Sequence, residues 1–160
     1  MSDFEALYER HAADVFRFAL YLCGDRAQAE DITSETFVRA WSVRDGLRAP
    51  TVKAYLFAIA RNLYREDRRR SWRRSELSES VEDVGPGPHA EAAARAELEL
   101  VMEALQSLPE ADRAALLMRA QDQMPYEEIA ATLGLSLAAA RVKVHRARVR
   151  LAALCGRRDP

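Results

Sequence analysis

Apolar residues recur at helical spacing through nearly all of the 160 residues of this chain. Between residues 29 and 41, the small and apolar positions fall at i, i+3, i+4, i+7, i+8, i+11 and i+12. This spacing places them on one side of an α-helix. No stretch alternates with the period of two that a half-buried strand shows. The sequence therefore predicts an all-α fold.

A polar and acidic stretch divides this helical pattern into two parts. It begins at Ser75 and closes with Gly85-Pro86-Gly87-Pro88, which is linker composition. We expect two small helical domains joined by a flexible linker, with the first domain over residues 1–74, the linker over 75–92 and the second domain over 93–156. Domains of roughly 70 residues have thin cores and often depend on a partner for stability.

The first domain contains signals for three helices. Ser2 and Glu5 form a capping box that begins the first helix, and Gly24 ends it. A second helix is expected over residues 27–43, and a third begins near Thr51 after a loop that contains glycine and proline. The second helix is expected to bury one stripe of residues: Ala29, Ile32, Thr33, Thr36, Phe37, Ala40 and Trp41.

The second domain ends in a helix-turn-helix pattern. A helix over about residues 90–107, with Leu98, Val101, Met102 and Leu105 on one face, is followed by two shorter helices that begin near prolines. A glycine turn and a serine N-cap then precede the last helix, which is the helix-turn-helix arrangement. The last helix is expected to bury the following residues: Leu137, Ala140, Val144, Ala147, Leu151 and Leu154.

The formal net charge of −1 results from two basic blocks that an acidic middle cancels. Residues 1–74 hold 14 basic and 11 acidic side chains, residues 75–112 hold 1 and 10, and residues 113–160 hold 9 and 4. A nearly neutral total would argue against nucleic acid as a partner, whereas locally basic segments favour it. The distribution therefore indicates two nucleic-acid-facing segments.

The last helix is basic, and no acidic residue occurs between positions 136 and 158. Its cations repel one another unless an anion compensates them, as DNA phosphates do. In a helix-turn-helix, the N-terminal part of the second helix reaches base edges in the major groove. A merely solvated basic helix is the alternative. The candidate duplex-binding residues are Ser136, Ala138, Ala139, Arg141, Val142, Lys143, His145, Arg146 and Arg148.

A second basic cluster follows Leu63, where six arginines occur within ten positions. Tyr55, Phe57, Tyr64 and Trp72 flank this cluster. Arginines that follow a phosphate backbone, together with aromatic rings on which bases stack, are typical of single-strand binding. The alternative is that the aromatic residues belong to the core and that the arginines only confer solubility.

The helix over residues 27–43 also has an acidic face. Glu30, Asp31 and Glu35 lie on it, beside Val38 and Arg39. This face is either simply solvated or a docking surface for a basic helical partner, for which complementary charge favours a fast and specific encounter.

The sequence contains no pattern typical of catalysis or of a cofactor. Cys23 and Cys155 lie far apart in the sequence, and His11, His89 and His145 have no metal-ligand spacing. No run of 18 or more apolar residues occurs, so we expect no membrane insertion. The N-terminus lacks the apolar core of a signal peptide, which favours a cytoplasmic protein. We expect no cofactor, no metal and no enzymatic activity.

Taken together, these motifs resemble the extracytoplasmic-function sigma factors of bacterial RNA polymerase. Ala29–Trp41 is similar to the helix of region 2 that docks on polymerase. Tyr55–Leu63, followed by Arg69 and Arg70, is similar to the helix that melts the promoter and reads its −10 element. Four segments resemble region 4: Leu105–Pro109, Arg113, Tyr126–Ala130 and His145–Arg148.

The resemblance implies a role for each charged surface. Glu30, Asp31, Glu35, Val38 and Arg39 would dock on a basic coiled coil of the largest polymerase subunit. The last helix would read the −35 element, the loop over residues 45–51 would receive an unstacked base, and an anti-sigma factor is an expected partner. The residues that would hold the −10 strand are Arg48, Lys53, Arg61, Asn62, Arg65, Arg68 and Arg69.

The chain departs from the family pattern at several positions. Tyr55 stands where the family usually has tryptophan, and Ala58 where it has a basic residue. Residues 138–143 read AAARVK instead of a pattern such as GTVKSR, so the −35 sequence that is read is expected to differ. Two other functions compete with this one. They are a helix-turn-helix regulator that does not associate with polymerase, and a small enzyme or metal sensor built on the cysteines and histidines.

Overall fold

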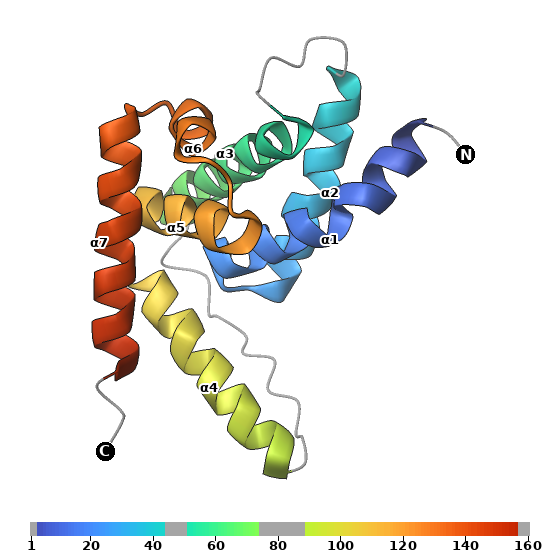
Figure 1. Cartoon of the computed structure of the whole chain (residues 1–160). Helices are drawn as coiled ribbons and strands as arrows, with labels where there is room; N and C mark the ends of the chain where they lie inside the picture. The colour runs from blue at the N-terminus through green and yellow to red at the C-terminus, as the bar shows by residue number, and fades with distance from the viewer. Residues whose placement is uncertain (1–2, 44–50, 74–88, 157–160) are drawn as a thin grey trace.

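The computed structural model describes residues 3–43, 51–73 and 89–156, which form helices and no strands (Figure 1). Ser2 and most of the expected linker therefore lie outside the described residues. The prediction of an all-α fold is confirmed. The described helices are α1 (Asp3–Cys23), α2 (Arg26–Ser42), α3 (Val52–Arg73), α4 (His89–Gln106), α5 (Glu110–Asp122), α6 (Tyr126–Leu133) and α7 (Leu137–Gly156).

Short polar side chains begin three of these helices. Asp25, Thr51 and Ser136 each accept a hydrogen bond from the backbone N–H three residues further on, at 3.0, 3.1 and 3.1 Å. These bonds satisfy donors that have no partner within α2, α3 and α7. Gly134 ends α6 in the left-handed conformation, with φ at 68°. The predicted glycine turn and serine N-cap before the last helix are therefore confirmed.

Gly24 ends α1 and also lets α4 approach closely. Its φ of 75° is one that residues with a Cβ rarely adopt, and a Cβ built there would lie 3.0 Å from the side chain of Gln106. Gln106 uses this proximity to donate from Nε2 to the carbonyl oxygen of Tyr21, at 2.9 Å. One glycine thus both terminates α1 and permits a contact with α4.

Helices α1, α2 and α3 pack together as the first domain. The rings of Phe18 and Phe57 stack at its centre, with 4.5 Å between their centroids. Thr33 and Thr36 are buried because their hydroxyls donate to backbone carbonyl oxygens one turn earlier, at 2.7 and 2.6 Å. The buried stripe predicted for α2 is confirmed, although Trp41 is only half-buried.

Helices α4 to α7 form the second domain, where α7 packs on α5 and α6. Ala140, Val144 and Ala147 are fully buried along the inner face of α7. The prediction was wrong for Leu137, which is exposed, whereas Leu151 and Leu154 are half-buried. Leu137 is the first residue of α7, beyond the part that faces α5.

Only the C-terminal part of α4 is packed against the core. Leu105 is buried and Met102 half-buried, but Leu98 is 50% exposed and Val101 is exposed as well. Figure 1 shows the N-terminal part of α4 extending away from the other helices. The four residues share one face of α4 as predicted, but only the C-terminal part of that face is covered, and Leu98 and Val101 stay exposed.

The two domains pack against each other. Helix α5 contacts α1, and α6 contacts α3 (Figure 1). Gln121 of α5 donates from Nε2 to the carbonyl oxygen of Asp14 in α1, at 2.9 Å. A single buried cluster contains apolar residues of both domains. The domain boundaries stay predictions, since residues 74–88 lie outside the described part of the chain.

Arg113 of α5 is a buried cation at the junction of the two domains. Its Nη1 donates to the carbonyl oxygens of Leu105, Gln106 and Leu108 at 3.2–3.3 Å, and its Nη2 donates to the Tyr64 hydroxyl at 3.1 Å. Burial lowers the pKa of Arg113 below its ordinary value. The guanidinium thus satisfies carbonyl groups at the end of α4 and reaches α3 of the first domain.

We expect Arg113→Met to lower the free energy of unfolding by about 2–4 kcal/mol, because it leaves buried carbonyl oxygens and a phenol without their donor. Urea denaturation followed by circular dichroism measures this change. Arg150→Met, at an exposed position of α7, is the matched control and should change the stability by less than about 0.5 kcal/mol. Equal losses in the two variants would contradict this role of Arg113.

Candidate nucleic-acid and docking interfaces

The acidic face of α2 lines a groove of about 550 Å³ that α3 closes on the other side. Val38 lies in it and is 55% exposed. Four of the five predicted docking residues line the groove. The fifth, Glu30, lies outside it and forms an ion pair with Arg26 at 3.5 Å. The charged and exposed apolar residues of the groove are Asp31, Glu35, Val38, Arg39, Asp67 and Arg70.

A network of ion pairs connects the two walls of this groove. Arg39 of α2 contacts Glu35 and reaches across to Glu66 of α3, at 3.4 Å in each case. Arg70 contacts Glu66 at 3.7 Å and Asp67 at 3.6 Å. The hydrogen bond to Glu66 raises the pKa of Arg39 above its ordinary value. The network orients Arg39 along the groove instead of outward.

Glu66, Asp67 and Arg70 were not among the predicted docking residues. The sequence does contain a hint of this pairing, because Glu66 and Asp67 are the only acidic residues within the arginine cluster of α3. Charge counts alone cannot separate the side of α3 that faces α2 from the side that faces solvent. The helical positions of the two acids, four residues or fewer from Arg70, could have indicated the pairing.

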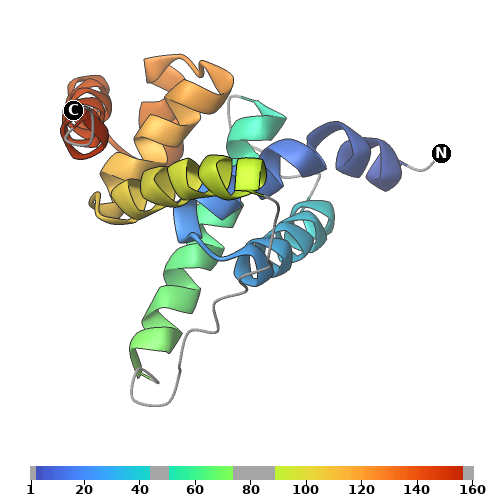
Figure 2. The ribbon, with the colours of Figure 1, turned by 90° about the horizontal axis from the view of Figure 1, so that it is seen from below.

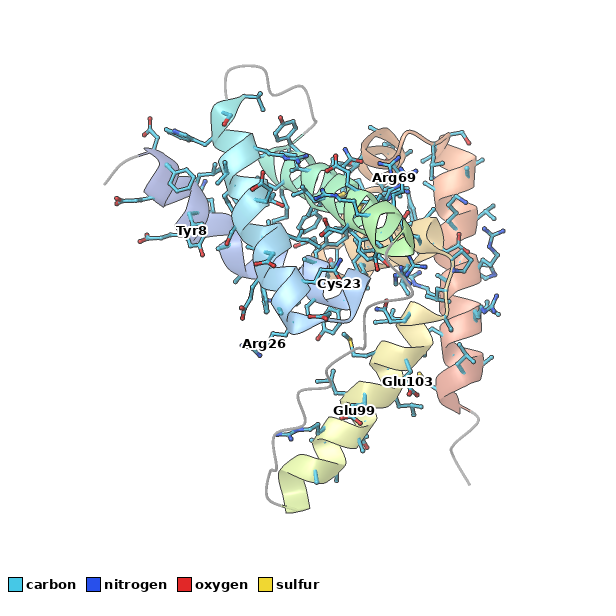
Figure 3. All side chains as sticks on the ribbon, turned by 180° about the vertical axis from the view of Figure 1, so that it is seen from behind. Tyr8, Cys23, Arg26, Arg69, Glu99 and Glu103 are labelled. Carbon is cyan, nitrogen blue, oxygen red and sulfur yellow. The ribbon has the colours of Figure 1, made fainter. Side chains whose placement is uncertain are left out.

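The predicted −10 residues of α3 fall into two groups. Asn62, Arg65, Arg68 and Arg69 are exposed. The C-terminal part of α3 extends beyond the packed helices (Figure 2), and Arg69 lies on it (Figure 3). Lys53, Arg61 and the start of α3 instead lie against the second domain. Arg48 and the rest of the loop over residues 44–50 lie outside the described residues.

Acidic side chains of the second domain bind Arg61 and Lys53. Arg61 donates from Nε and Nη2 to both carboxylate oxygens of Glu110, each at 2.8 Å. Lys53 Nζ lies 2.9 Å from Asp14 of its own domain and 3.0 Å from Asp122 of α5. Burial lowers the pKa of Lys53, but the bonds to Asp14 and Asp122 outweigh it and leave the pKa above its ordinary value.

Two of the aromatic residues expected beside a single strand belong to the core. Phe57 is fully buried against Phe18, and Tyr64 is buried with its hydroxyl on Arg113. The proposed stacking role is therefore wrong for Phe57 and Tyr64, because helix packing covers their rings. Tyr55 is half-buried, and the side chain of Trp72 lies outside the described residues.

An acidic side chain from another helix neutralises part of the basic face of α7. The charge count over residues 136–158 could not include it, because it belongs to α5. Asp112 of α5 is 2% exposed and accepts two hydrogen bonds from Arg146, at 2.8 and 2.9 Å. Lys143 lies 3.6 Å from the same carboxylate. The sequence indicates DNA phosphates as the compensating anion, whereas Arg146 and Lys143 already have one within the chain. Arg146 nevertheless keeps a 55% exposed side chain.

The start of α7 presents the remaining candidate base contacts. Ala138, Arg141, Val142, His145 and Arg148 are exposed, and Ala139 is half-buried. Ala138, Val142 and His145 lie on the side of α7 opposite the buried stripe, where a duplex could approach, whereas Arg141 and Arg148 lie nearer the edges of the stripe. Ser136 uses its hydroxyl as the N-cap of the helix.

Tyr126 of α6 contacts two guanidinium groups and was not among the predicted site residues. Arg119 of α5 lies over its ring at 4.6 Å from the centroid, and Arg141 of α7 lies 5.7 Å from it. Arg119 is itself held by the carbonyl oxygen of Met124, at 3.1 Å. Aromatic faces attract cations, so Tyr126 positions Arg141 at the start of α7.

No group of three histidine, cysteine or acidic side chains that could hold a metal occurs within the described residues. Cys23 donates its thiol to the carbonyl oxygen of Asp25, and burial raises its pKa to about 11. Such a thiol stays protonated and is a poor nucleophile or metal ligand. No helix of the described residues is long and apolar enough to cross a membrane.

The chain matches two family profiles in the order of its two domains. Residues 7–74 match "Sigma-70 region 2", and residues 98–151 match "Sigma-70, region 4". The chain is 34% identical to the ECF RNA polymerase sigma factor SigE of Mycolicibacterium smegmatis, over 94% of the chain and 61% of that protein. It is 33% identical to SigL of Mycobacterium tuberculosis, over 88% of the chain and 81% of that protein.

Two solved structures share the arrangement of the helices. One is the sigma factor RpoE of Bartonella quintana in complex with the anti-sigma factor NepR, with a TM-score of 0.77 and 25% identity over 99% of this chain and 100% of that one. The other is CnrH in complex with the cytosolic domain of CnrY, with a TM-score of 0.74 and 28% identity over 98% and 89%.

The Asp112 carboxylate should contribute stability that depends on pH. The bond from Arg146 holds the pKa of Asp112 below its ordinary value of 3.8, so the contribution is complete above that pH. It is lost as the pH falls through the depressed pKa of the folded state.

We therefore expect Asp112→Ala to lower the urea midpoint at pH 7, and we expect the difference from the unsubstituted chain to shrink at pH 3 and below. Denaturation curves at both pH values measure this effect. The exposed Asp31→Ala serves as the control and should leave the midpoint nearly unchanged. A difference that stays constant with pH would show that the ion pair does not stabilise the fold.

Proposed function

The chain belongs to the extracytoplasmic-function sigma factors of bacterial RNA polymerase, and we propose that it binds core polymerase, recognises two promoter elements and opens the DNA. One observation carries this proposal: sigma-70 region 2 and region 4 follow each other in this chain, and each of them has a charged surface. The groove of the first region is rich in acidic side chains, and α7 of the second is basic. The chain spans 61% of the length of SigE, so its activity is proposed from the matched part.

The groove between α2 and α3 is the proposed docking site for polymerase. Val38 offers an apolar anchor, and Asp31 and Glu35 beside it favour a basic helix as the partner. Because the ion-pair network fixes Arg39, docking requires little further ordering of this side chain. A coiled coil of the largest subunit with basic residues along one face fits this surface.

The exposed part of α3 is proposed to hold the opened −10 strand. Asn62, Arg65, Arg68 and Arg69 supply hydrogen-bond donors and positive charge for phosphates. Extruding a base from the duplex costs a few kcal/mol. Phosphate contacts along α3 and a pocket in the loop over residues 45–51 would offset that cost.

Helix α7 is proposed to read the −35 element in the major groove of duplex DNA. Arg141 suits a guanine, to which it can donate two hydrogen bonds, and Val142 suits the methyl group of a thymine. His145, Arg146 and Arg148 lie further along the helix, where they would contact bases or phosphates. The chain performs no bond chemistry in this proposal, since polymerase catalyses RNA synthesis.

An anti-sigma factor is a further proposed partner, by extension from the RpoE complex with NepR. Such a complex would form in the cytoplasm, where polymerase works. A helix-turn-helix regulator without polymerase is not favoured, because it would leave the whole of region 2 without a role.

Asp31→Arg combined with Glu35→Arg should weaken binding to core polymerase by more than about tenfold, or 1.4 kcal/mol, because it places cations against a basic partner. Surface plasmon resonance with immobilised core enzyme measures the affinity. Glu97→Arg combined with Glu99→Arg, on exposed α4, changes the net charge equally and should leave the affinity intact. Unchanged affinity of the first variant would place the docking site elsewhere.

Arg141→Ala should change which −35 sequence is preferred and cost about 1–3 kcal/mol on the cognate site if Arg141 contacts a guanine. Transcription from a library of promoters that vary in the −35 element, with purified polymerase, measures this preference. Arg150→Ala is the control on the same helix and should keep the preference. A uniform loss on all sequences would instead make Arg141 a phosphate contact.

A further inference from the structure

The ring of Tyr126, at the start of α6, lies next to guanidinium groups from two other helices. The guanidinium carbon of Arg119 in α5 lies 4.6 Å from the ring centroid, and that of Arg141 in α7 lies 5.7 Å from it. Figure 1 shows α6 beside the N-terminal end of α7, where the candidate base contacts lie. An aromatic ring outside α7 is therefore in contact with a residue that is proposed to read DNA.

The end of α5 holds the first of these two guanidinium groups. Gln123 there has a φ of 52°, in the left-handed region. Nη1 of Arg119 donates to the carbonyl oxygens of Gln123 and Met124, at 3.4 and 3.1 Å. Because these bonds tie Arg119 to the turn that leads into α6, its contact with the ring of Tyr126 has a fixed side. The turn, Arg119 and Tyr126 thus form one unit.

Arg141 is restrained much less than the other cations of α7. Asp112 binds both Arg146 and Lys143. Among the described residues, no carboxylate or carbonyl group binds the guanidinium of Arg141, whose contact is the ring of Tyr126. A long side chain that is free to rotate loses affinity when binding fixes it in one rotamer. The ring is therefore the group that can restrict Arg141 before DNA binds.

Contact with the ring is compatible with reading a base. A guanidinium is attracted to an aromatic ring through its flat face, whereas its N–H groups donate within its own plane. Arg141 can therefore stay against Tyr126 while two of its N–H groups donate to the acceptors of a guanine. Tyr126 does not need to touch DNA in order to affect which base is preferred.

We propose that Tyr126 is a positioning residue for −35 recognition, and that its ring, held by Arg119, places Arg141 before DNA binds. This inference rests on the proposed function, since it takes α7 to be the helix that reads the −35 element. The base preference at the position that Arg141 contacts is then set partly from α5 and α6. The ring of Tyr126 is required for this role and its hydroxyl is not.

A direct phosphate contact through the hydroxyl is the other way in which Tyr126 could act. A phosphate contact changes the affinity alike for all sequences, whereas a positioning residue changes the preference at one base pair. Two variants separate these roles. Tyr126→Leu removes the ring, and Tyr126→Phe removes only the hydroxyl.

The test uses the full chain with purified core polymerase and a library of promoters that vary in the −35 element. The two Tyr126 variants are compared with Arg141→Ala and with Tyr126→Leu combined with Arg141→Ala. Tyr8→Leu, at a 43% exposed position of α1, is the matched control for loss of a ring. The measured quantity is the ratio of transcription with the preferred base to that with the other bases. Circular dichroism verifies that every variant is folded.

We expect Tyr126→Leu to lower this ratio about two- to tenfold, at the same position as Arg141→Ala, because Arg141 loses its placement. Tyr126→Phe and Tyr8→Leu should keep the ratio. The double variant should lose no more than Arg141→Ala alone, since Tyr126 acts through Arg141.

Nuclear magnetic resonance of the free chain tests the same contact without polymerase. The ring current of Tyr126 should move the side-chain proton signals of Arg141 upfield of their ordinary positions. These signals should return to the ordinary positions in Tyr126→Leu and stay shifted in Tyr126→Phe. Unshifted signals in the unsubstituted chain would overturn the inference.

Equal losses of preference in Tyr126→Phe and Tyr126→Leu would also overturn it, because the hydroxyl and not the ring would then be required. The same holds for a loss that is uniform over all −35 sequences, or for losses that add in the double variant. Failure of the unsubstituted chain to direct transcription that depends on the −35 element would instead count against the proposed function. The signals of Arg141 would in that case still decide whether the ring holds this side chain.

Discussion

The buried guanidinium of Arg113 is the interaction on which the arrangement of the helices depends. It joins the end of α4, the start of α5 and Tyr64 of α3, so one side chain fixes both the turn between two helices and the contact between two domains. Because its bonds go to carbonyl oxygens and a phenol, they leave no second charge to be buried. The orientation of α5 that results brings Glu110 and Asp122 to α3 and Asp112 to α7.

Each of three charged surfaces has an acidic partner from another helix. Asp112 pairs with the basic face of α7, Glu110 pairs with Arg61 of α3, and Glu66 pairs with Arg39 across the groove between α2 and α3. These pairs neutralise part of each charged surface, whereas other arginines, such as Arg65, Arg69 and Arg148, stay exposed.

The sequence was sufficient for what depends on local chemistry. Helical periodicity, the serine and glycine at the ends of helices and the buried stripe of α2 all follow from residues close to one another in the chain. Contacts between distant segments could not be read in the same way. The exposure of Leu98, the burial of Tyr64 and the pairing of Arg146 with Asp112 each depend on which helix lies opposite, and the charge count over residues 136–158 could not include α5.

The position of Lys53 between two carboxylates bears on how the two domains are held together. Asp14 belongs to the same domain as Lys53, so the ammonium keeps a counter-ion when Asp122 moves away with α5. Lys53 therefore has a counter-ion within its own domain in addition to the one that α5 supplies. Arg61 and Glu110 are joined by two parallel hydrogen bonds, so this pair ties α5 to α3 more firmly than the single contact between Lys53 and Asp122.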